Sequence, residues 1–394
     1  MKIRINSIVI FLLLIPIFQP KLFTQIPAFS FLYIILNLLV FTFLSCKLIL
    51  QGGRMPNIIG IWLSYRVYLL FIGIINGRVT GILQWGYLTL VITCLMLIFE
   101  IYGFSDFTTI VKFVAVISVV LLALNYYTLL IFPRGVIQST FYEVEAGDYY
   151  LLGIKTQFTT MMFPALSASS LYMYIKRNWN SKVLFGCSIV FCLLNIFNKS
   201  ISTAIVGIFL YIGLFAISHI FKFKYNEWIC LVTFFVFHIL VVFFRIQDLM
   251  ASFIINVLHK DTTMSSRVNI WDSAIHLLNN QNIIKWLFGN GIFKDEAFVP
   301  FGSGLWQPHN QLLALIYSGG IIGTVFFITF IFLLLKVRKQ LDGIQSLLMV
   351  CLCVLVLSVT EVYFGVAFSY IPFILMFYYQ KFCDNKECAN ILDN

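Results

Sequence analysis

The sequence predicts an all-α polytopic integral membrane protein with about twelve transmembrane helices. Of its 394 residues, 61% are apolar and 11% are charged, whereas soluble domains average roughly 45–50% and about 25%. A soluble surface cannot be built from this composition. The apolar residues also gather in runs near the roughly 20 residues that a helix needs to cross a bilayer. These runs take up the whole length, so residues 1–394 are predicted to form a single membrane domain.

Twelve apolar runs are interpreted as spans. They are Ile5 to Phe18, Phe29 to Cys46, Ile58 to Ile75, Ile82 to Ile101, Val111 to Phe132, Phe158 to Ile175, Val183 to Phe197, Ile201 to Ile217, Trp228 to Phe244, Gln311 to Leu335, Ile344 to Thr360 and Tyr363 to Tyr379. The domain thus divides into nine spans within 1–244, a large loop over 245–308, three spans within 309–380 and a tail over 381–394. The first run follows Lys2 and Arg4 like a signal peptide, but no small-residue cleavage site follows it, so a retained helix is expected.

Basic residues between the runs predict the orientation, because cytoplasmic loops are enriched in Lys and Arg. With the N-terminus inside, fifteen basic residues fall on the inner side and ten on the outer side. The inner residues are Lys2, Arg4, Lys47, Arg54, Lys112, Lys176, Arg177, Lys182, Lys222, Lys224, Lys336, Arg338, Lys339, Lys381 and Lys386. Both termini are therefore predicted to be cytoplasmic, and the loop over 245–308 lies outside.

The net charge of +10 does not indicate nucleic-acid binding, because the basic residues occur in short clusters between apolar runs. The nine cysteines fall in apolar runs or in the tail. Disulfides are therefore not expected, and Cys383 with Cys388 lacks the partners of a zinc site. The sequence also has no phosphate-binding loop, no metal-ligand cluster and no paired-aspartate motif of nucleotide-sugar enzymes. No cofactor is expected, and any substrate must arrive already activated.

Two long outer connections are the places where function is expected, since long loops usually carry it. The first, Pro133 to Gln157, holds Arg134 and several acids and tyrosines, which could hold a sugar or form an interfacial aromatic belt. In the second, Thr262 to Ser266 supplies helix-capping residues and apolar residues follow at helical spacing. This pattern predicts an amphipathic helix lying along the membrane, followed by a turn at Gly289-Asn290-Gly291.

Two residues, one within the second connection and one directly after it, could carry chemistry. Arg267 lies in the first turn of the expected helix, four residues before Trp271, which places both side chains on one, membrane-facing side. An arginine beside the free N–H groups of a helix N-terminus suits a pyrophosphate, although snorkelling to lipid headgroups explains it too. His309 lies at the membrane boundary, where a histidine can act as a general base or orient a hydroxyl, or be structural.

Other polar residues are weaker candidates. Arg66 and His238 lie inside spans, where ionisable groups are costly, but interhelical hydrogen bonds account for them more simply. Glu361, between the last two spans, could support a site or mark a turn. Lys199, at an outer hairpin, could contact a phosphate, and the serines beside it are explained equally well as helix caps.

The order of these elements resembles the bacterial O-antigen polymerase and ligase superfamily. The resemblance covers roughly residues 265–323. It rests on Ser266-Arg267-Val268-Asn269-Ile270-Trp271, Phe288-Gly289-Asn290-Gly291, His309-Asn310-Gln311-Leu312-Leu313 and Gly320. Members of that family join lipid-linked sugar repeats on the outer face of the bacterial inner membrane, without metal or nucleotide. The resemblance therefore implies a multi-pass inner-membrane enzyme whose active site faces the periplasm.

The resemblance also assigns roles by position. Arg267 would bind pyrophosphate, and His309 would activate or orient the acceptor hydroxyl with Asn310 beside it. Trp271, Lys199, Arg134 and Glu361 are the further substrate-binding candidates. Gly289 and Gly291 would shape the turn, and Gly320 and Gly323 would let helices pack closely. Family members often have a Ser-Arg pair where this chain has Lys199-Ser200-Ile201-Ser202, so Lys199 is a possible substitute.

The function favoured is a polymerase of O-antigen or capsular polysaccharide. Its partners would be oligosaccharides linked to undecaprenyl pyrophosphate, membrane lipid and a chain-length regulator protein, with no nucleic acid. Two alternatives stay open: a ligase that transfers finished polymer to a lipid A core or another acceptor, and a flippase that does no covalent chemistry. A transporter more often shows inverted repeats and midplane charges, and one dominant outer loop argues against it.

Overall fold

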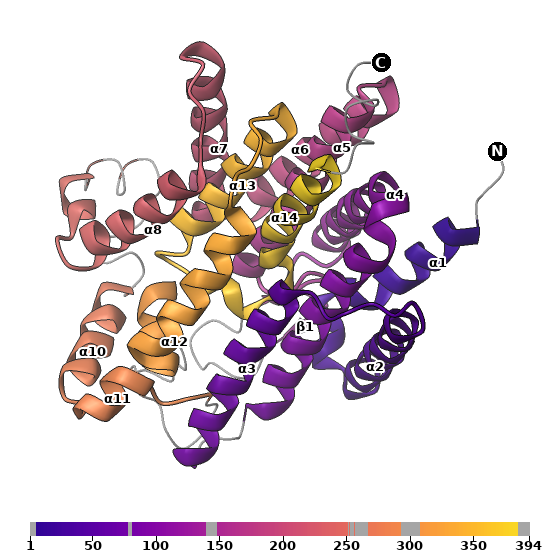
Figure 1. Ribbon diagram of the computed structural model, residues 1–394. Coiled ribbons are helices and arrows are strands. Elements are labelled where there is room, and N and C mark those ends of the chain that lie inside the picture. Colours follow the sequence, from indigo (N-terminus) through magenta and orange to yellow (C-terminus); the bar gives the residue numbers. More distant parts are fainter. Residues whose placement is uncertain are drawn as a thin grey trace.

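The computed structural model describes residues 5–77, 81–138, 148–250, 252, 256, 267–292 and 308–384, and they are nearly all helical (Figure 1). Within these described ranges, six helices are long and apolar enough to cross a membrane. These are α2 (Pro27–Leu50), α3 (Asn57–Ile75), α4 (Ile82–Ile131), α6 (Trp179–Lys199), α7 (Ser202–Ile220) and α12 (Gln311–Leu335). The prediction of a helical, polytopic membrane protein is confirmed at this level, while the number of twelve spans stays a prediction.

The remaining elements are shorter or more polar. The α-helices are α1 (Ile5–Leu14), α5 (Phe158–Lys176), α8 (Glu227–Val242), α10 (Arg267–Asn279), α11 (Ile283–Phe288), α13 (Asp342–Leu357) and α14 (Ile371–Asp384). The 3-10 turns are η1 (Ile15–Phe18), η2 (Lys21–Gln25), η3 (Lys155–Gln157), η4 (Ile246–Met250), η5 (Tyr363–Gly365) and η6 (Ala367–Tyr370). Strands β1 (Ile137–Gln138) and β2 (Asp148–Tyr149) pair antiparallel in the first outer connection.

Helix α4 covers two of the predicted spans, Ile82 to Ile101 and Val111 to Phe132. Its residue Asp106 has non-helical backbone angles (φ −130°, ψ 23°). The rings of Phe99 and Phe107 lie 5.8 Å apart between centroids, although eight residues rise about 12 Å along a straight helix. The chain therefore bends at Asp106, and one continuous element supplies two helical legs.

The last predicted span, Tyr363 to Tyr379, is only partly α-helical. Its first residues form the turns η5 and η6, and Val366 between them is extended (φ −124°, ψ 131°). Regular helix starts at Ile371, with Pro372 in the first turn, where its missing N–H needs no partner. Hydropathy alone does not distinguish these turns from a helix, because their side chains are apolar and largely buried.

The centre of the molecule is formed by α5 and α13. Almost every residue of α13 is buried, from Gly343 to Leu357, and α5 is buried over most of its length. The outer helices α2 and α7 instead expose large apolar side chains such as Leu39 and Phe209. Water would oppose such exposure, whereas lipid tails would cover it without cost.

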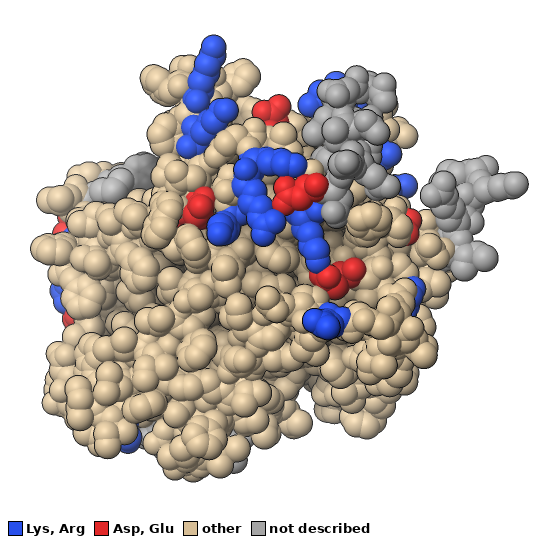
Figure 2. Space-filling view, viewed as in Figure 1, with Lys and Arg blue, Asp and Glu red and all other residues tan. Residues whose placement is uncertain are grey.

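Charged side chains gather at one end of the molecule, drawn at the top in Figure 2, above a wide belt of uncharged residues. Ion pairs join the C-terminal ends of α12 and α14 there: Arg338 lies 2.9 Å from Asp384, and Lys339 lies 3.3 Å from it. Lys381 pairs with Glu100 at 2.6 Å. The basic members of these pairs belong to the connections predicted to be cytoplasmic.

Arg66 and His238, the two candidates inside predicted spans, make different contacts. Arg66 of α3 donates to the Thr89 hydroxyl at 2.9 Å and to the Trp85 carbonyl at 3.0 Å, both on α4, so the predicted interhelical hydrogen bonding is confirmed for it. For His238 the interhelical hydrogen bonding stays a prediction, because ring atom Nδ1 contacts its own helix α8. That nitrogen lies 2.7 Å from the carbonyl of Phe234, one turn back in the same helix.

Candidate active site

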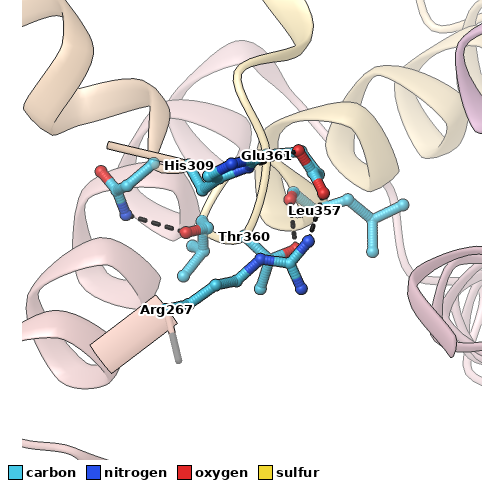
Figure 3. Close-up of polar contacts among 7 residues, drawn as sticks. Arg267, His309, Leu357, Thr360 and Glu361 are labelled. Atoms are coloured by element: carbon cyan, nitrogen blue, oxygen red, sulfur yellow. Dashed lines mark hydrogen bonds and ion pairs between the residues drawn. The ribbon is translucent and has the colours of Figure 1, made fainter. Parts of the chain in front are cut away.

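Three residues far apart in sequence meet at one point of the structure (Figure 3). Arg267 opens α10, His309 immediately precedes the cap of α12, and Glu361 follows α13. The Nη2 atom of Arg267 forms an ion pair with Glu361 Oε1, and His309 Nδ1 lies 3.1 Å from Glu361 Oε2. Glu361 therefore links Arg267 and His309, the two residues to which the sequence assigns chemistry.

The three side chains are only partly shielded from solvent. Their exposed fractions are 17% for Arg267, 24% for His309 and 12% for Glu361. Burial alone would raise the pKa of Glu361, but the hydrogen bond from His309 and the positive charge of Arg267 outweigh burial. The pKa of Glu361 is therefore lowered from its ordinary value, and its carboxylate is ionised at neutral pH.

An ionised Glu361 determines which nitrogen of His309 carries a proton. A carboxylate only accepts hydrogen bonds, so His309 Nδ1 must be the donor in the 3.1 Å contact. In a neutral imidazole the other nitrogen, Nε2, then has a free lone pair. On Arg267 the contact with Glu361 uses Nη2, and a guanidinium has further N–H donors. The cluster thus combines a proton acceptor with a cationic donor.

The backbone at His309 is strained. Its φ is +45°, a left-handed conformation that costs a residue with a side chain roughly 1–2 kcal/mol. The neighbouring Asn310 holds this turn in place as the N-cap of α12: its side chain accepts from Leu313 N at 2.9 Å and donates to the Val359 carbonyl at 2.9 Å. Strain of this kind often accompanies a functional position.

Asn310 itself offers little to a substrate in this structure, because it is fully buried and both ends of its amide are used within the fold. Its neighbour Gln311 fastens the loop that carries Glu361. Gln311 N donates to the Ser358 carbonyl at 2.9 Å, and its side-chain oxygen accepts from Phe364 N at 3.0 Å. Thr360 adds a bond to the Leu357 carbonyl (Figure 3). The start of α12 thereby positions both His309 and Glu361.

The predicted helix after Ser266 is present as α10, but its apolar side does not face the membrane as expected. Trp271 is 1% exposed and lies in a buried cluster with residues of α8, α12 and the loop after α13. The spacing correctly places Arg267 and Trp271 on one side of the helix. That side is covered by protein because Leu313 and Tyr317 of α12 supply an apolar surface. As a substrate-binding candidate, Trp271 is therefore shielded in this structure.

The position of α10 is also fixed by a charge pair that sequence reasoning did not single out. Arg245, just after α8, contacts both carboxylate oxygens of Asp272 at 2.7 and 2.8 Å. Asp272 follows Trp271 in the chain, so this pair holds the middle of α10 to the end of α8. The proposed capping residues Thr262 to Ser266 lie outside the described residues.

The glycine turn Gly289-Asn290-Gly291, which follows α11, packs against α12 where that helix is interrupted. Gly289 and Gly291 have φ of +80° and +77°. Asn290 N and Gly291 N donate to the carbonyls of Tyr317 and Ser318 at 3.0 and 2.7 Å. A methyl group on Gly291 would collide with the backbone of Gly73. Glycine is therefore required at this point by both conformation and space.

The break itself is at Gly320, whose backbone (φ 61°, ψ −166°) interrupts α12. Tyr68 of α3, which sequence reasoning missed, stabilises the break by donating to the carbonyls of Phe288 and Gly319, 2.9 Å from each. Gly323 lies against the Tyr68 ring. A tyrosine hydroxyl inside an apolar run needs a partner, and this was the available signal for Tyr68.

The ordered pattern from Arg267 to Gly323 lies within a segment that matches the model of a known family. Residues 187–328 match the model of a family described as O-antigen ligase. The resemblance to the O-antigen polymerase and ligase superfamily is thus confirmed. A comparison with curated proteins gives no match. The matched segment contains Arg267, the glycine turn and His309 but ends before Glu361, so the third member of the cluster comes from outside it.

Two of the remaining substrate-binding candidates lie at the first outer connection. Lys199 donates to the Pro133 carbonyl at 2.8 Å and lies 4.7 Å from the centroid of the Tyr150 ring. Tyr150 is buried and donates to the same carbonyl at 2.8 Å, so it belongs to the core. Arg134 is exposed. These contacts of Lys199 tie it to the first outer connection, whereas Arg267 and His309 contact Glu361.

Proposed function

We propose that the protein is a glycosyltransferase that joins oligosaccharide repeat units carried on undecaprenyl pyrophosphate, that is, a polymerase of O-antigen or capsular polysaccharide. The proposal is carried by the joint contact of Arg267 and His309 with Glu361. It is supported by the match of residues 187–328 to the O-antigen ligase family. The expected partners are the lipid-linked oligosaccharides, membrane lipid and a chain-length regulator protein.

In the proposed reaction, a hydroxyl oxygen of the acceptor saccharide attacks the anomeric carbon of the donor saccharide. A new carbon–oxygen bond forms while the bond between the anomeric carbon and the pyrophosphate breaks. The hydroxyl proton passes to His309 Nε2, the nitrogen left free by the contact with Glu361. The negative charge of Glu361 then stabilises the resulting imidazolium, as the carboxylate does in a catalytic triad.

Arg267 stabilises the leaving group in this proposal. Negative charge grows on the pyrophosphate as the glycosidic bond breaks, so a guanidinium held nearby acts mainly on the transition state. The ion pair with Glu361 orients the guanidinium before the substrate binds. Pyrophosphate is a good leaving group, and the proposal therefore includes no metal ion and no nucleotide.

The site is proposed to face the periplasm. It lies at the N-terminal end of α12, whereas the basic residues Lys336, Arg338 and Lys339 follow the C-terminal end of that 25-residue helix. Clusters of basic residues stay on the cytoplasmic side. Reporter fusions after Lys182, Lys224 and Arg338 should therefore read cytoplasmic, and fusions near Gly147 and Lys285 should read external. A cytoplasmic Lys285 would separate the site from its substrates.

A ligase is the second candidate, and the description of the matched family favours it. The two reactions share the donor and the leaving group and differ only in the acceptor, which is a lipid-linked saccharide for a polymerase and a lipid A core or another acceptor for a ligase. The geometry around Glu361 suits both, because it concerns proton transfer and the pyrophosphate.

Deletion of the gene followed by analysis of surface glycolipid tests the proposal and separates the two reactions. Loss of a polymerase should leave single repeat units on the lipid core. Loss of a ligase should leave a bare core with accumulated lipid-linked polymer. Unchanged glycolipid and polysaccharide in the deletion strain would refute both. Complementation with the wild-type chain, but not with a variant that replaces His309, should restore long polymer.

A further inference from the structure

A groove between α4, α5 and α6 lies apart from the candidate active site. These three helices pack against one another on one side of the molecule (Figure 1). The groove has a volume of about 540 Å³. Its apolar walls come from the second leg of α4 and from α6, including Val116, Val120, Val183 and Phe191. Val120 and Val183 are 48% and 43% exposed, so the groove is open toward the surroundings of the protein.

One end of the groove is polar and positively charged. Lys112 of α4 lines it, together with Asn178 and Asn180 at the start of α6. Among the described residues that line the groove, none is acidic. Lys176, Arg177 and Lys182 flank the same connection in the sequence. The groove therefore pairs an apolar channel with a basic, hydrogen-bonding end, which suits an amphiphile with an anionic head.

The depth of the groove limits the length of its occupant. From Lys112 to Ala123, the residues of α4 that line it rise about 16 Å. The hydrocarbon region of a bilayer is about 30 Å thick, so this distance equals about one leaflet. An acyl chain of one leaflet fits that depth, whereas a bilayer-spanning chain does not.

The position of Lys112 indicates which leaflet of the membrane the polar end of the groove faces. Lys112 lies six residues past the bend of α4 at Asp106. Glu100, six residues before the bend, pairs with Lys381 at the charged end of the molecule. This is the end predicted to be cytoplasmic. Basic pockets between transmembrane helices on that side bind the headgroups of anionic lipids.

We propose that the groove between α4, α5 and α6 binds an anionic glycerophospholipid of the cytoplasmic leaflet. Lys112 and the two asparagines hold the phosphate-containing head, and the walls formed by α4 and α6 hold one acyl chain. In the predicted topology, Lys112 lies at the cytoplasmic start of the second leg of α4, whereas Glu361 follows the outer end of α13. This inference concerns a different site and does not depend on the proposed reaction.

Native mass spectrometry of the purified full-length protein tests this proposal. Phosphatidylglycerol and phosphatidylcholine with identical acyl chains should be compared. Phosphatidylglycerol should bind about fivefold more tightly or better, since one basic residue near an anionic head contributes about that factor. Lys112→Gln should remove the preference, whereas Lys285→Gln, a matched change outside the groove, should retain it. Equal binding of the two lipids to the wild-type protein would overturn the proposal.

Two further variants and a displacement assay complete the test. If Lys112→Gln fails to fold, Asn180→Glu places a negative charge at an exposed position and should weaken phosphatidylglycerol selectively. Ala123→Trp should fill the apolar part and weaken both lipids. Water-soluble glycerol phosphate should not displace the lipid, because it lacks the acyl chain that occupies the walls. Displacement by glycerol phosphate, or unchanged lipid preference in both charge variants, would overturn the assignment to a membrane lipid.

Discussion

The Glu361 carboxylate accepts a hydrogen bond from His309 Nδ1 at 3.1 Å across 52 residues of sequence. The same carboxylate forms an ion pair with Arg267, 94 residues away. One acidic side chain thus fixes the orientation of a potential base and of a potential cationic stabiliser. The most direct tests of the candidate site therefore begin with Glu361.

Glu361→Gln should lower the turnover of lipid-linked substrate by about 10- to 100-fold, the usual effect of removing a group that orients a functional residue. The amide keeps the size of the side chain but removes the charge that stabilises protonated His309. Turnover is measured on purified protein by polymer length and released undecaprenyl pyrophosphate. Glu100→Gln, which also removes an ion-paired carboxylate but at the charged end, should retain wild-type turnover. Equal activity of both variants would remove Glu361 from the mechanism.

The lowered pKa of Glu361 also predicts a pH-dependent stability. A carboxyl group whose pKa is lower in the folded state stabilises the fold above its unfolded pKa, near 4.3, and this contribution is lost as the pH falls through the folded value. The difference in melting temperature between wild type and Glu361→Gln should therefore be constant at neutral pH and shrink below about pH 4.3. A difference that instead grows on acidification would contradict the assigned direction of the shift.

Replacing Arg267 should weaken the reaction without removing the protein from the membrane. Arg267→Ala loses the proposed contact with pyrophosphate, and a loss of a hundredfold or more in turnover is expected from a charge-assisted contact made mainly in the transition state. Arg267→Lys should recover only part of it, because lysine lacks the planar fork. Arg338→Ala and Arg338→Lys, at an exposed ion pair, serve as controls and should retain activity. Full rescue by lysine would indicate a nonspecific role of the charge.

Much of the architecture could be predicted from hydropathy, because spacing and composition determine where helices form. The bend at Asp106 separates two predicted spans, and α10 occupies the segment where helical spacing was found. Hydropathy could not distinguish the turns η5 and η6 from a helix, or locate the break at Gly320. Both depend on hydrogen bonds to distant segments, such as the contact of Tyr68 with Gly319, which local sequence does not encode.

The site could be predicted only in part, for a similar reason. Arg267 and His309 stand out by their place in an ordered pattern, but nothing around Glu361 distinguishes it from a turn residue. Its role follows from the packing of the loop after α13 on the start of α12. Asn310 directly precedes an apolar helix, a position typical of an N-cap, and this signal predicts its structural role. Helical spacing placed Trp271 beside Arg267 but did not reveal which surface covers that side.

The glycine turn gives a prediction about folding rather than chemistry. Gly291→Ala should strongly reduce the amount of folded protein, because alanine disfavours φ of +77° and its methyl group would collide with the backbone of Gly73. Gly186→Ala is the matched control, since Gly186 lies within helix α6 and has no atom near the added methyl group. That change should be neutral or slightly stabilising. Detergent-extracted protein and its melting temperature measure both effects, and a normally folded Gly291→Ala variant would contradict the described turn.

Substitutions of His309 can separate the proposed role of its imidazole from the strain of its backbone. His309→Ala and His309→Gly should both abolish polymer formation, because each removes the proposed proton acceptor. The glycine variant should be as stable as the alanine variant or more stable by up to about 1 kcal/mol, since only glycine adopts φ of +45° without strain.

His309→Gln completes the series. It keeps a hydrogen-bonding side chain but cannot act as a base near neutral pH, so residual turnover would indicate that orienting the acceptor hydroxyl contributes beside proton removal. Polymer length, membrane abundance and melting temperature should be measured for all three variants. Wild-type polymer from His309→Ala at normal abundance would show that the imidazole is dispensable and would leave only the structural role of this turn.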